Sequence, residues 1–158
     1  MLVAGIDLGT QSIKVLVYDS LEKREVCVSS CPLDLISRPD GSREQKAEWY
    51  LDALRKCFSS FDGEVKKNIE ALSVSGQQHG FVPLGKDGEV LWNVKLWCDT
   101  STAPECSEIE EAFGGREKVI DEVGNPILPG YTASKILWLK KNHRKEYEAM
   151  DYVLLPHD

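Results

Sequence analysis

The 158-residue sequence lacks the clustered cysteines and histidines that hold a transition metal. Its five cysteines show no C-x-x-C spacing, and an odd number without such pairs does not indicate a disulfide framework or a zinc site. The three histidines (His79, His143 and His157) lie far apart and form no H-E-x-x-H pattern. The cysteines are therefore expected to be free thiols of a reducing cytoplasm.

Long apolar runs and basic segments are also missing. Charged residues such as Asp7 and Lys14 interrupt even the apolar N-terminal segment, and no stretch is long enough to span a bilayer. The start of the chain has no basic segment followed by an apolar one, so a signal peptide is not expected. The net charge of −7 argues against nucleic acid and anionic membranes as partners, because both attract clustered Lys and Arg. Without a G-x-x-x-x-G-K-[ST] loop, a P-loop enzyme is excluded as well.

What the sequence does contain is the pattern of one soluble α/β domain. The hydrophobic fraction of 42% and the charged fraction of 28% are typical of a globular protein with a core. Apolar periodicity predicts strands and helices in turn, and their order favours a mixed sheet. The predicted strands cover 2–6, 13–17, 25–31, 69–75 (as a buried strand), the hairpin 81–91 and 152–155; the predicted helices cover 50–61, 102–113, 116–123, 132–142 and 145–150.

The turn at residues 5–12 joins the first two predicted strands. Gly9 is expected to adopt a positive φ and let the backbone approach a ligand, and exposed N–H groups in such a turn suit an anion. Asp7, at the end of the first strand, is placed to hold a hard cation or its waters. An ordinary hairpin whose aspartate caps its own turn explains the same residues equally well.

The loop at residues 76–80 follows a predicted strand and holds polar side chains between two glycines. Gln78 and His79 can each donate or accept a hydrogen bond, as recognition of sugar hydroxyls requires. The alternative is a polar loop solvated by water.

Two further segments carry side chains of interest. Trp97 and Asp99 pair a flat aromatic ring with a carboxylate, a combination that often holds sugars. A core tryptophan beside a helix-capping aspartate is the better interpretation of these two residues alone. Residues 129–135 form a turn into a helix whose N-terminus can bind an anion, although a plain capped helix is commoner. Thr102 and Glu105 match a capping box, T-x-x-E, at the start of another helix.

Taken together and in this order, these segments resemble the FGGY carbohydrate kinases of the sugar kinase–Hsp70–actin superfamily. The segments that carry the resemblance are 5–10, 76–80, 96–99, 129–135 and 153–158. Within the family, the Gln-Gln-His-Gly loop and the Leu-Leu-Pro-His-Asp ending look most like members that phosphorylate D-xylulose. The resemblance implies an α/β fold of the actin-like ATPase (ribonuclease H-like) type. Residues 1–158 would be a single, incomplete N-terminal part of the first kinase domain.

The resemblance also implies an activity and a division of labour. The activity is the ATP- and Mg²⁺-dependent transfer of a phosphoryl group to D-xylulose, giving D-xylulose 5-phosphate. The residues that match the family pattern are Asp7 on the catalytic side, holding Mg²⁺ through water; Gly9, Thr10, Gln11 and Ser12 toward the ATP phosphates; and Gln78, His79, Trp97 and Asp99 in the sugar pocket.

Two departures from the family pattern limit these expectations. Many members carry an arginine two residues after the aspartate of the W-x-D motif, where this chain has Ser101. The catalytic base and the adenosine-binding domain of the family lie beyond residue 158, so this chain alone is expected to be inactive. Alternatives are a sibling kinase acting on ribulose, glycerol or gluconate, and a non-catalytic sugar-binding module. We also expect the apolar edge after Leu155 to favour self-association, such as a homodimer.

Overall fold

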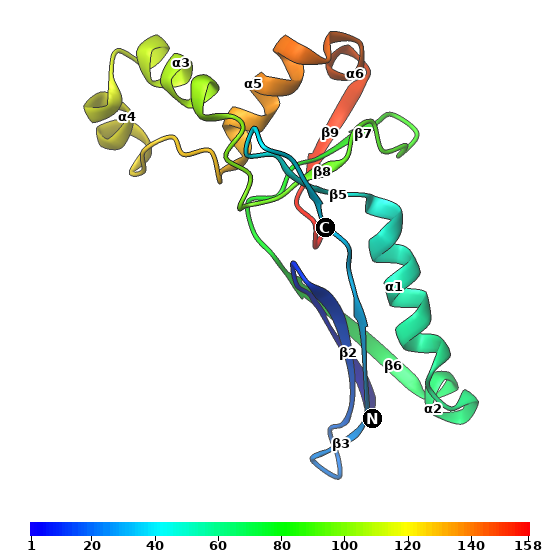
Figure 1. Cartoon of the computed structure of the whole chain (residues 1–158). Coiled ribbons are helices and arrows are strands. Elements are labelled where there is room, and N and C mark those ends of the chain that lie inside the picture. The colour runs from blue at the N-terminus through cyan, green and yellow to red at the C-terminus, as the bar shows by residue number, and fades with distance from the viewer. The chain divides into compact units, whose positions relative to one another are not determined.

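The computed structural model describes residues 1–158, which form two compact units. The first unit contains Met1–Leu35, Lys46–Gln77 and His157, and the second contains Ile36–Gln45, Gln78–Pro156 and Asp158. In chain order, the elements are β1 (Leu2–Leu8), β2 (Ser12–Asp19), β3 (Arg24–Pro32), β4 (Ile36–Ser37), β5 (Arg43–Gln45), α1 (Ala47–Ser59), α2 (Gly63–Lys67), β6 (Ile69–Gly76), β7 (Val82–Gly85), β8 (Val94–Lys95), α3 (Ala103–Phe113), α4 (Arg116–Val123), α5 (Thr132–Asn142), α6 (Arg144–Glu148) and β9 (Met150–Leu154) (Figure 1). The prediction of one domain over the whole chain stays a prediction.

The first unit is built on a mixed sheet with the strand order β3-β2-β1-β6. β1 and β2 form the predicted antiparallel pair around the turn, and β6 runs parallel to β1. The register sets Asp7 opposite Lys14 on β2 and opposite Ser75 on β6. Asp7 therefore lies between two neighbouring strands at the end of β1.

Alternation along the strands gives this sheet one buried and one exposed face. On the buried face lie apolar residues of β1 and β2: Ala4, Ile6, Leu8, Ile13, Val15 and Val17. The helix α1 packs against β2 and β3, and its buried Tyr50, Ala53 and Cys57 complete this core. Gly5, Asp7 and Lys14 are exposed and belong to the opposite face.

The strand β6 corrects one prediction. Its apolar sequence predicted a buried strand, but Leu72 is 64% exposed and Val74 is 39% exposed. The reason is its place at the edge of the sheet, because α1 packs against β2 and β3 at the other side. Apolar composition alone cannot tell an edge strand from a central one.

The second unit contains two small sheets, with the orders β4-β5-β8 and β7-β9, together with the helices α3 to α6. The predicted hairpin at residues 81–91 is present, since the Gly85 N–H donates to the Glu89 carbonyl at 3.0 Å. Its second arm makes only an isolated bridge, and the strand partner of β7 is β9. No helix in either unit is both long and apolar enough to cross a membrane.

The predicted capping box at the start of α3 is wrong. The Thr102 side chain makes no cap hydrogen bond; its hydroxyl lies 2.9 Å from the Ser134 hydroxyl on α5. Glu105 is buried and pairs with Lys141 of α5 at 3.2 Å. Contacts between α3 and α5 therefore replace the local pattern that the sequence favoured.

Candidate functional site

The turn between β1 and β2 is closed by its own backbone. The Gly9 N–H donates to the Ser12 carbonyl at 3.1 Å. Gly9 does not have a positive φ, so that part of the sequence prediction is wrong. Glycine fits here for a different reason, because a Cβ on Gly9 would lie 3.1 Å from the Ser12 carbonyl oxygen. The tightness of the turn leaves little room for a side chain.

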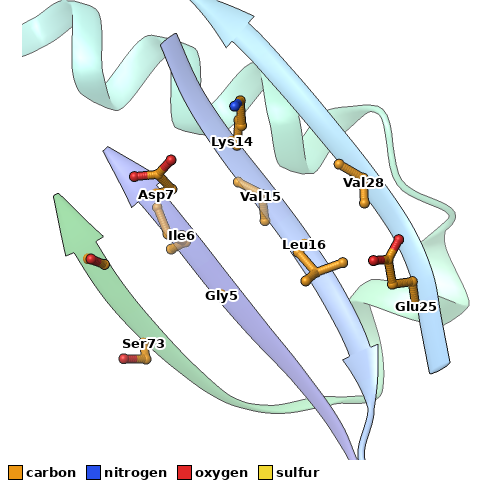
Figure 2. A pocket seen from close by; sticks show the side chains of 10 residues that line it. Gly5, Ile6, Asp7, Lys14, Val15, Leu16, Glu25, Val28 and Ser73 are labelled. Atoms are coloured by element: carbon orange, nitrogen blue, oxygen red, sulfur yellow. The ribbon is translucent and has the colours of Figure 1, made fainter. Parts of the chain in front are cut away.

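A cavity of about 450 Å³ opens beside Asp7. Figure 2 shows residues of all four strands around it, with the carboxylate of Asp7 and the side chain of Lys14 on neighbouring strands. Ser73 and Ser75 of β6 line the same cavity. The exposed carboxylate of Asp7 is therefore accessible to a ligand beside this sheet.

Gln77 supports the turn, a role that the sequence did not predict. Its backbone N–H donates to the Leu8 carbonyl at 3.0 Å, and its side-chain oxygen accepts a hydrogen bond from the Thr10 hydroxyl at 3.4 Å. Its side-chain nitrogen is buried without a hydrogen-bond partner. Gln77 thus links the end of β6 to the turn. The only signal in the sequence was its place in the Gln-Gln pair.

The residues around Asp7 fit a magnesium ion only in part. The structure has no group of three or more His, Cys, Asp or Glu side chains that could hold a metal by themselves. Mg²⁺ commonly binds through one or two carboxylates, with water and substrate phosphates completing its shell. One exposed carboxylate beside a cavity is compatible with that arrangement.

In the second unit, three of the predicted sugar-side residues are exposed. Gln78 and His79 are exposed in the loop that leads to β7, and Trp97 is 51% exposed in the segment after β8. The imidazole of His79 lies against the ring of Tyr131, with centroids 4.7 Å apart and the ring planes tilted by 42°. The predicted residues are therefore distributed between the units, with residues 7–12 in the first and 78–99 in the second.

Asp99 differs from these three because it is completely buried. One carboxylate oxygen accepts hydrogen bonds from the N–H and the hydroxyl of Ser101, at 3.0 and 2.6 Å. The other accepts from the Arg43 N–H at 2.9 Å and from the Lys95 ammonium at 3.0 Å. These four bonds use the acceptor capacity of a carboxylate. The sugar contact predicted for Asp99 would require this network to open.

Lys95 is the cation at the centre of the same network. Its ammonium donates to Glu44 at 3.2 Å and to the Ser101 hydroxyl at 3.0 Å, besides Asp99. It also lies 4.1 Å from the ring centroid of Trp138, a cation–π distance. Ser101 occupies the position where the family resemblance predicted arginine. In this chain, a lysine from β8 supplies a positive charge to Asp99.

Glu44 is the second carboxylate of this network and pairs with Arg38 and Lys95. Burial raises its pKa, but hydrogen bonds from Arg38 and Asn93 and the charge of Lys95 outweigh burial, so that its pKa is lowered overall. The side chain is 1% exposed and stays ionised at neutral pH. The carboxylates of Glu44 and Asp99 are thus matched by Arg38 and Lys95.

Comparison with known families gives the family of the chain. Residues 2–158 match the N-terminal domain of the FGGY family of carbohydrate kinases. The chain belongs to this family. This FGGY chain is 36% identical over 161 residues to the xylulose kinase of Haemophilus influenzae, covering 98% of the chain and 33% of that protein. It is also 36% identical over 161 residues to the xylulose kinase of Bacillus subtilis, covering 99% of the chain and 31% of that protein.

Solved structures of the family share its fold. A crystal structure of a "xyloylose kinase" from Brucella ovis matches with a TM-score of 0.88 and 30% identity, over 100% of this chain and 33% of that one. A gluconate kinase from Lactobacillus acidophilus matches with a TM-score of 0.83 and 25% identity, over 98% of this chain and 31% of that one. The predicted α/β fold of the actin-like ATPase type is confirmed. The FGGY chain spans about a third of the length of these relatives.

Proposed function

We propose that this chain is the sugar-side third of an ATP-dependent kinase that phosphorylates D-xylulose. The observation that carries the proposal is the exposed pair of His79 and Trp97, both in the second unit and both next to buried, hydrogen-bonded groups. The resemblance of the surrounding loops to kinases of the FGGY family supports the same substrate class, as do the relatives named xylulose kinase.

On the sugar side, each exposed group has a distinct role. The imidazole of His79 and the amide of Gln78 donate or accept hydrogen bonds with sugar hydroxyls. The indole of Trp97 offers an apolar face to the carbon-bound edge of the sugar. Asp99 orders the segment beneath Trp97 through Arg43 and Lys95. Direct contact of Asp99 with the sugar remains the alternative.

On the phosphate side, the turn at residues 9–12 faces the ATP phosphates, with Gly9, Thr10, Gln11 and Ser12 as its members. Asp7 would hold Mg²⁺ through water beside this turn. The ion would neutralise charge on the phosphates, and phosphoryl transfer depends mainly on such neutralisation and on in-line positioning. The chain's own contribution is a carboxylate and a closely packed turn. The cytoplasm, where ATP is available, is the proposed location.

Calorimetry on the 158-residue chain tests the sugar proposal. D-xylulose is expected to bind saturably, and more tightly than ribulose, glycerol or gluconate. His79→Gln and Trp97→Ala are each expected to weaken binding by about tenfold, the loss of one good contact. Tyr152→Ala is the matched control, because Tyr152 is an aromatic residue of the second unit that is 55% exposed. Equal binding of all four ligands, or tighter binding of ribulose, gluconate or glycerol, would reject D-xylulose as the substrate.

A nucleotide assay separates a kinase from a sugar-binding module. The chain alone is expected to consume no ATP with D-xylulose, because it spans only about a third of the length of its kinase relatives. A non-hydrolysable ATP analogue with Mg²⁺ is expected to bind, and Asp7→Asn is expected to weaken that binding. Sugar binding without any response to the nucleotide would instead identify a non-catalytic module.

A further inference from the structure

The backbone of His79 has a conformation that needs support. Its φ is +63°, in the left-handed region that is costly for residues other than glycine. Such a residue persists in this conformation only when its surroundings hold it there. On one side, the loop is closed by Gly80, where a Cβ would overlap the ring of Pro156. The contacts of His79 itself all come from another part of the chain.

Those contacts come from the start of α5 and the residue before it. The ammonium of Lys135 donates to the His79 carbonyl at 2.7 Å, and the Thr132 hydroxyl donates to the same oxygen at 3.3 Å. The ring of Tyr131 contacts the imidazole in a tilted arrangement. The peptide after His79 and its side chain are therefore held by three neighbours of one segment.

Burying a lysine at position 135 costs free energy. It is completely buried and forms no ion pair in the structure. An apolar side chain of similar length would fill the space without the cost of removing a charge from water. What the ammonium supplies is a link between two carbonyls, that of His79 and that of Gly130 at 2.8 Å.

Gly130 connects this link to the second exposed group. A Cβ at this residue would lie 2.7 Å from the Trp97 carbonyl oxygen, so the backbones of Gly130 and Trp97 are in close contact. Lys135 thus lies where the supports of His79 and Trp97 meet. The polar groups of residues 129–135 thus donate to backbone carbonyls of this chain, and no bound anion is needed to explain them.

We propose that Lys135, with Tyr131 and Thr132, is a positioning residue that holds the exposed imidazole of His79 in its orientation for a sugar hydroxyl. The sugar contact rests on the proposed function. The positioning concerns only groups of this chain and is measurable without a sugar.

The test uses the 158-residue chain and two readouts. The first is the order of the His79 imidazole, from ¹³C relaxation and from the nuclear Overhauser effect between the His79 and Tyr131 rings. The second is the Kd for D-xylulose. Lys135→Met removes the ammonium and keeps an apolar stem of similar length. Lys145→Met is the matched control, because Lys145 is an exposed lysine of α6 in the same unit.

Lys135→Met is expected to lose the ring–ring Overhauser effect and to bind D-xylulose about tenfold more weakly, since the pocket is no longer preorganised. Lys145→Met should match the wild type. Should Lys135→Met fail to fold, Thr132→Val combined with Tyr131→Leu replaces two half-buried contacts of His79, and the same loss of imidazole order is expected there. An ordered imidazole and an unchanged Kd in a folded variant would overturn the proposal. If the wild type binds no D-xylulose, the proposed function fails, while the imidazole order still decides the positioning role.

Discussion

Replacing Asp99 by asparagine should destabilise the second unit strongly. The carboxylate receives hydrogen bonds on both oxygens, and an amide keeps only one oxygen. In its better orientation, the new amide group faces Ser101 and leaves the Ser101 N–H without an acceptor. Glu44 is then the only carboxylate that pairs with the buried ammonium of Lys95. Breaking a buried ion pair costs about 3–5 kcal/mol, and the lower end applies because one partner remains.

Urea unfolding followed by tryptophan fluorescence measures this loss. The chain has four tryptophans, of which Trp49 belongs to the first unit. A Trp49→Phe background therefore restricts the signal to the second unit, where the Trp138 ring lies close to Lys95. Asp99→Asn in this background is expected to lower the free energy of unfolding by about 3 kcal/mol. Asp151→Asn, at an exposed aspartate of β9, is expected to change it by less than about 0.5 kcal/mol.

The outcome also decides between two roles for Asp99. A carboxylate that serves mainly to bind sugar keeps free acceptor capacity, so its conversion to asparagine would weaken sugar binding and barely change stability. A loss below about 1 kcal/mol, within the range of an ordinary hydrogen bond, would refute the argument that Asp99 joins a filled buried network.

Three further predictions follow from single residues. Burial lowers the pKa of Lys135 from 10.5 to about 8, so between pH 8 and 10.5 the unfolded chain binds more protons than the folded chain. In urea unfolding, the stability of the wild type relative to Lys135→Met should therefore rise from pH 8 to 10.5. A fall over this range would contradict the argument. At pH values above 4.5, the ordinary pKa of glutamate, the lowered pKa of Glu44 stabilises the folded chain. The stability advantage of the wild type over Glu44→Gln should therefore shrink, and not grow, as the pH falls below 4.5. Gly130→Ala should cost about 1–3 kcal/mol and change Trp97 fluorescence, since the new Cβ would meet the Trp97 carbonyl. Gly63→Ala, with open space around its Cβ, is the control, and equal stability of the two variants would contradict the steric argument.

Local pattern predicted the longer elements of the fold but not the short α2, β4, β5 and β8. The helix expected at residues 132–142 is α5 with the same bounds, and the strand expected at 25–31 is β3 with one more residue at each end. These segments have strong apolar periodicity or clear stops such as Gly124, which ends α4 in a left-handed conformation. The errors arose where tertiary contacts decide, as at the buried Glu105 and the exposed edge strand β6.

In the candidate site, too, local pattern predicted some features and missed those that depend on tertiary contacts. Sequence pattern located the loops and named His79 and Trp97, because glycines and strand ends mark such loops. It could not show that Asp99 is buried, because its burial also involves contacts such as that with the Arg43 N–H, 56 positions away along the chain. Nor could it assign Lys135, whose carbonyl acceptor at His79 lies 56 positions away. A single sequence carries no local signal for contacts at such separations.

The two buried lysines explain how exposed loops in the second unit can hold fixed side chains. Loops usually vary in conformation because few buried groups hold their backbone. Here Lys95 holds the carboxylate of Asp99, two residues after Trp97, and Lys135 holds the carbonyl of His79. Each ammonium is completely buried, and its burial costs free energy. The fold is therefore less stable than it could be, but the loops are better ordered at these two places. Rigid exposed groups lose less entropy when a ligand binds, which is the advantage expected of the proposed sugar pocket.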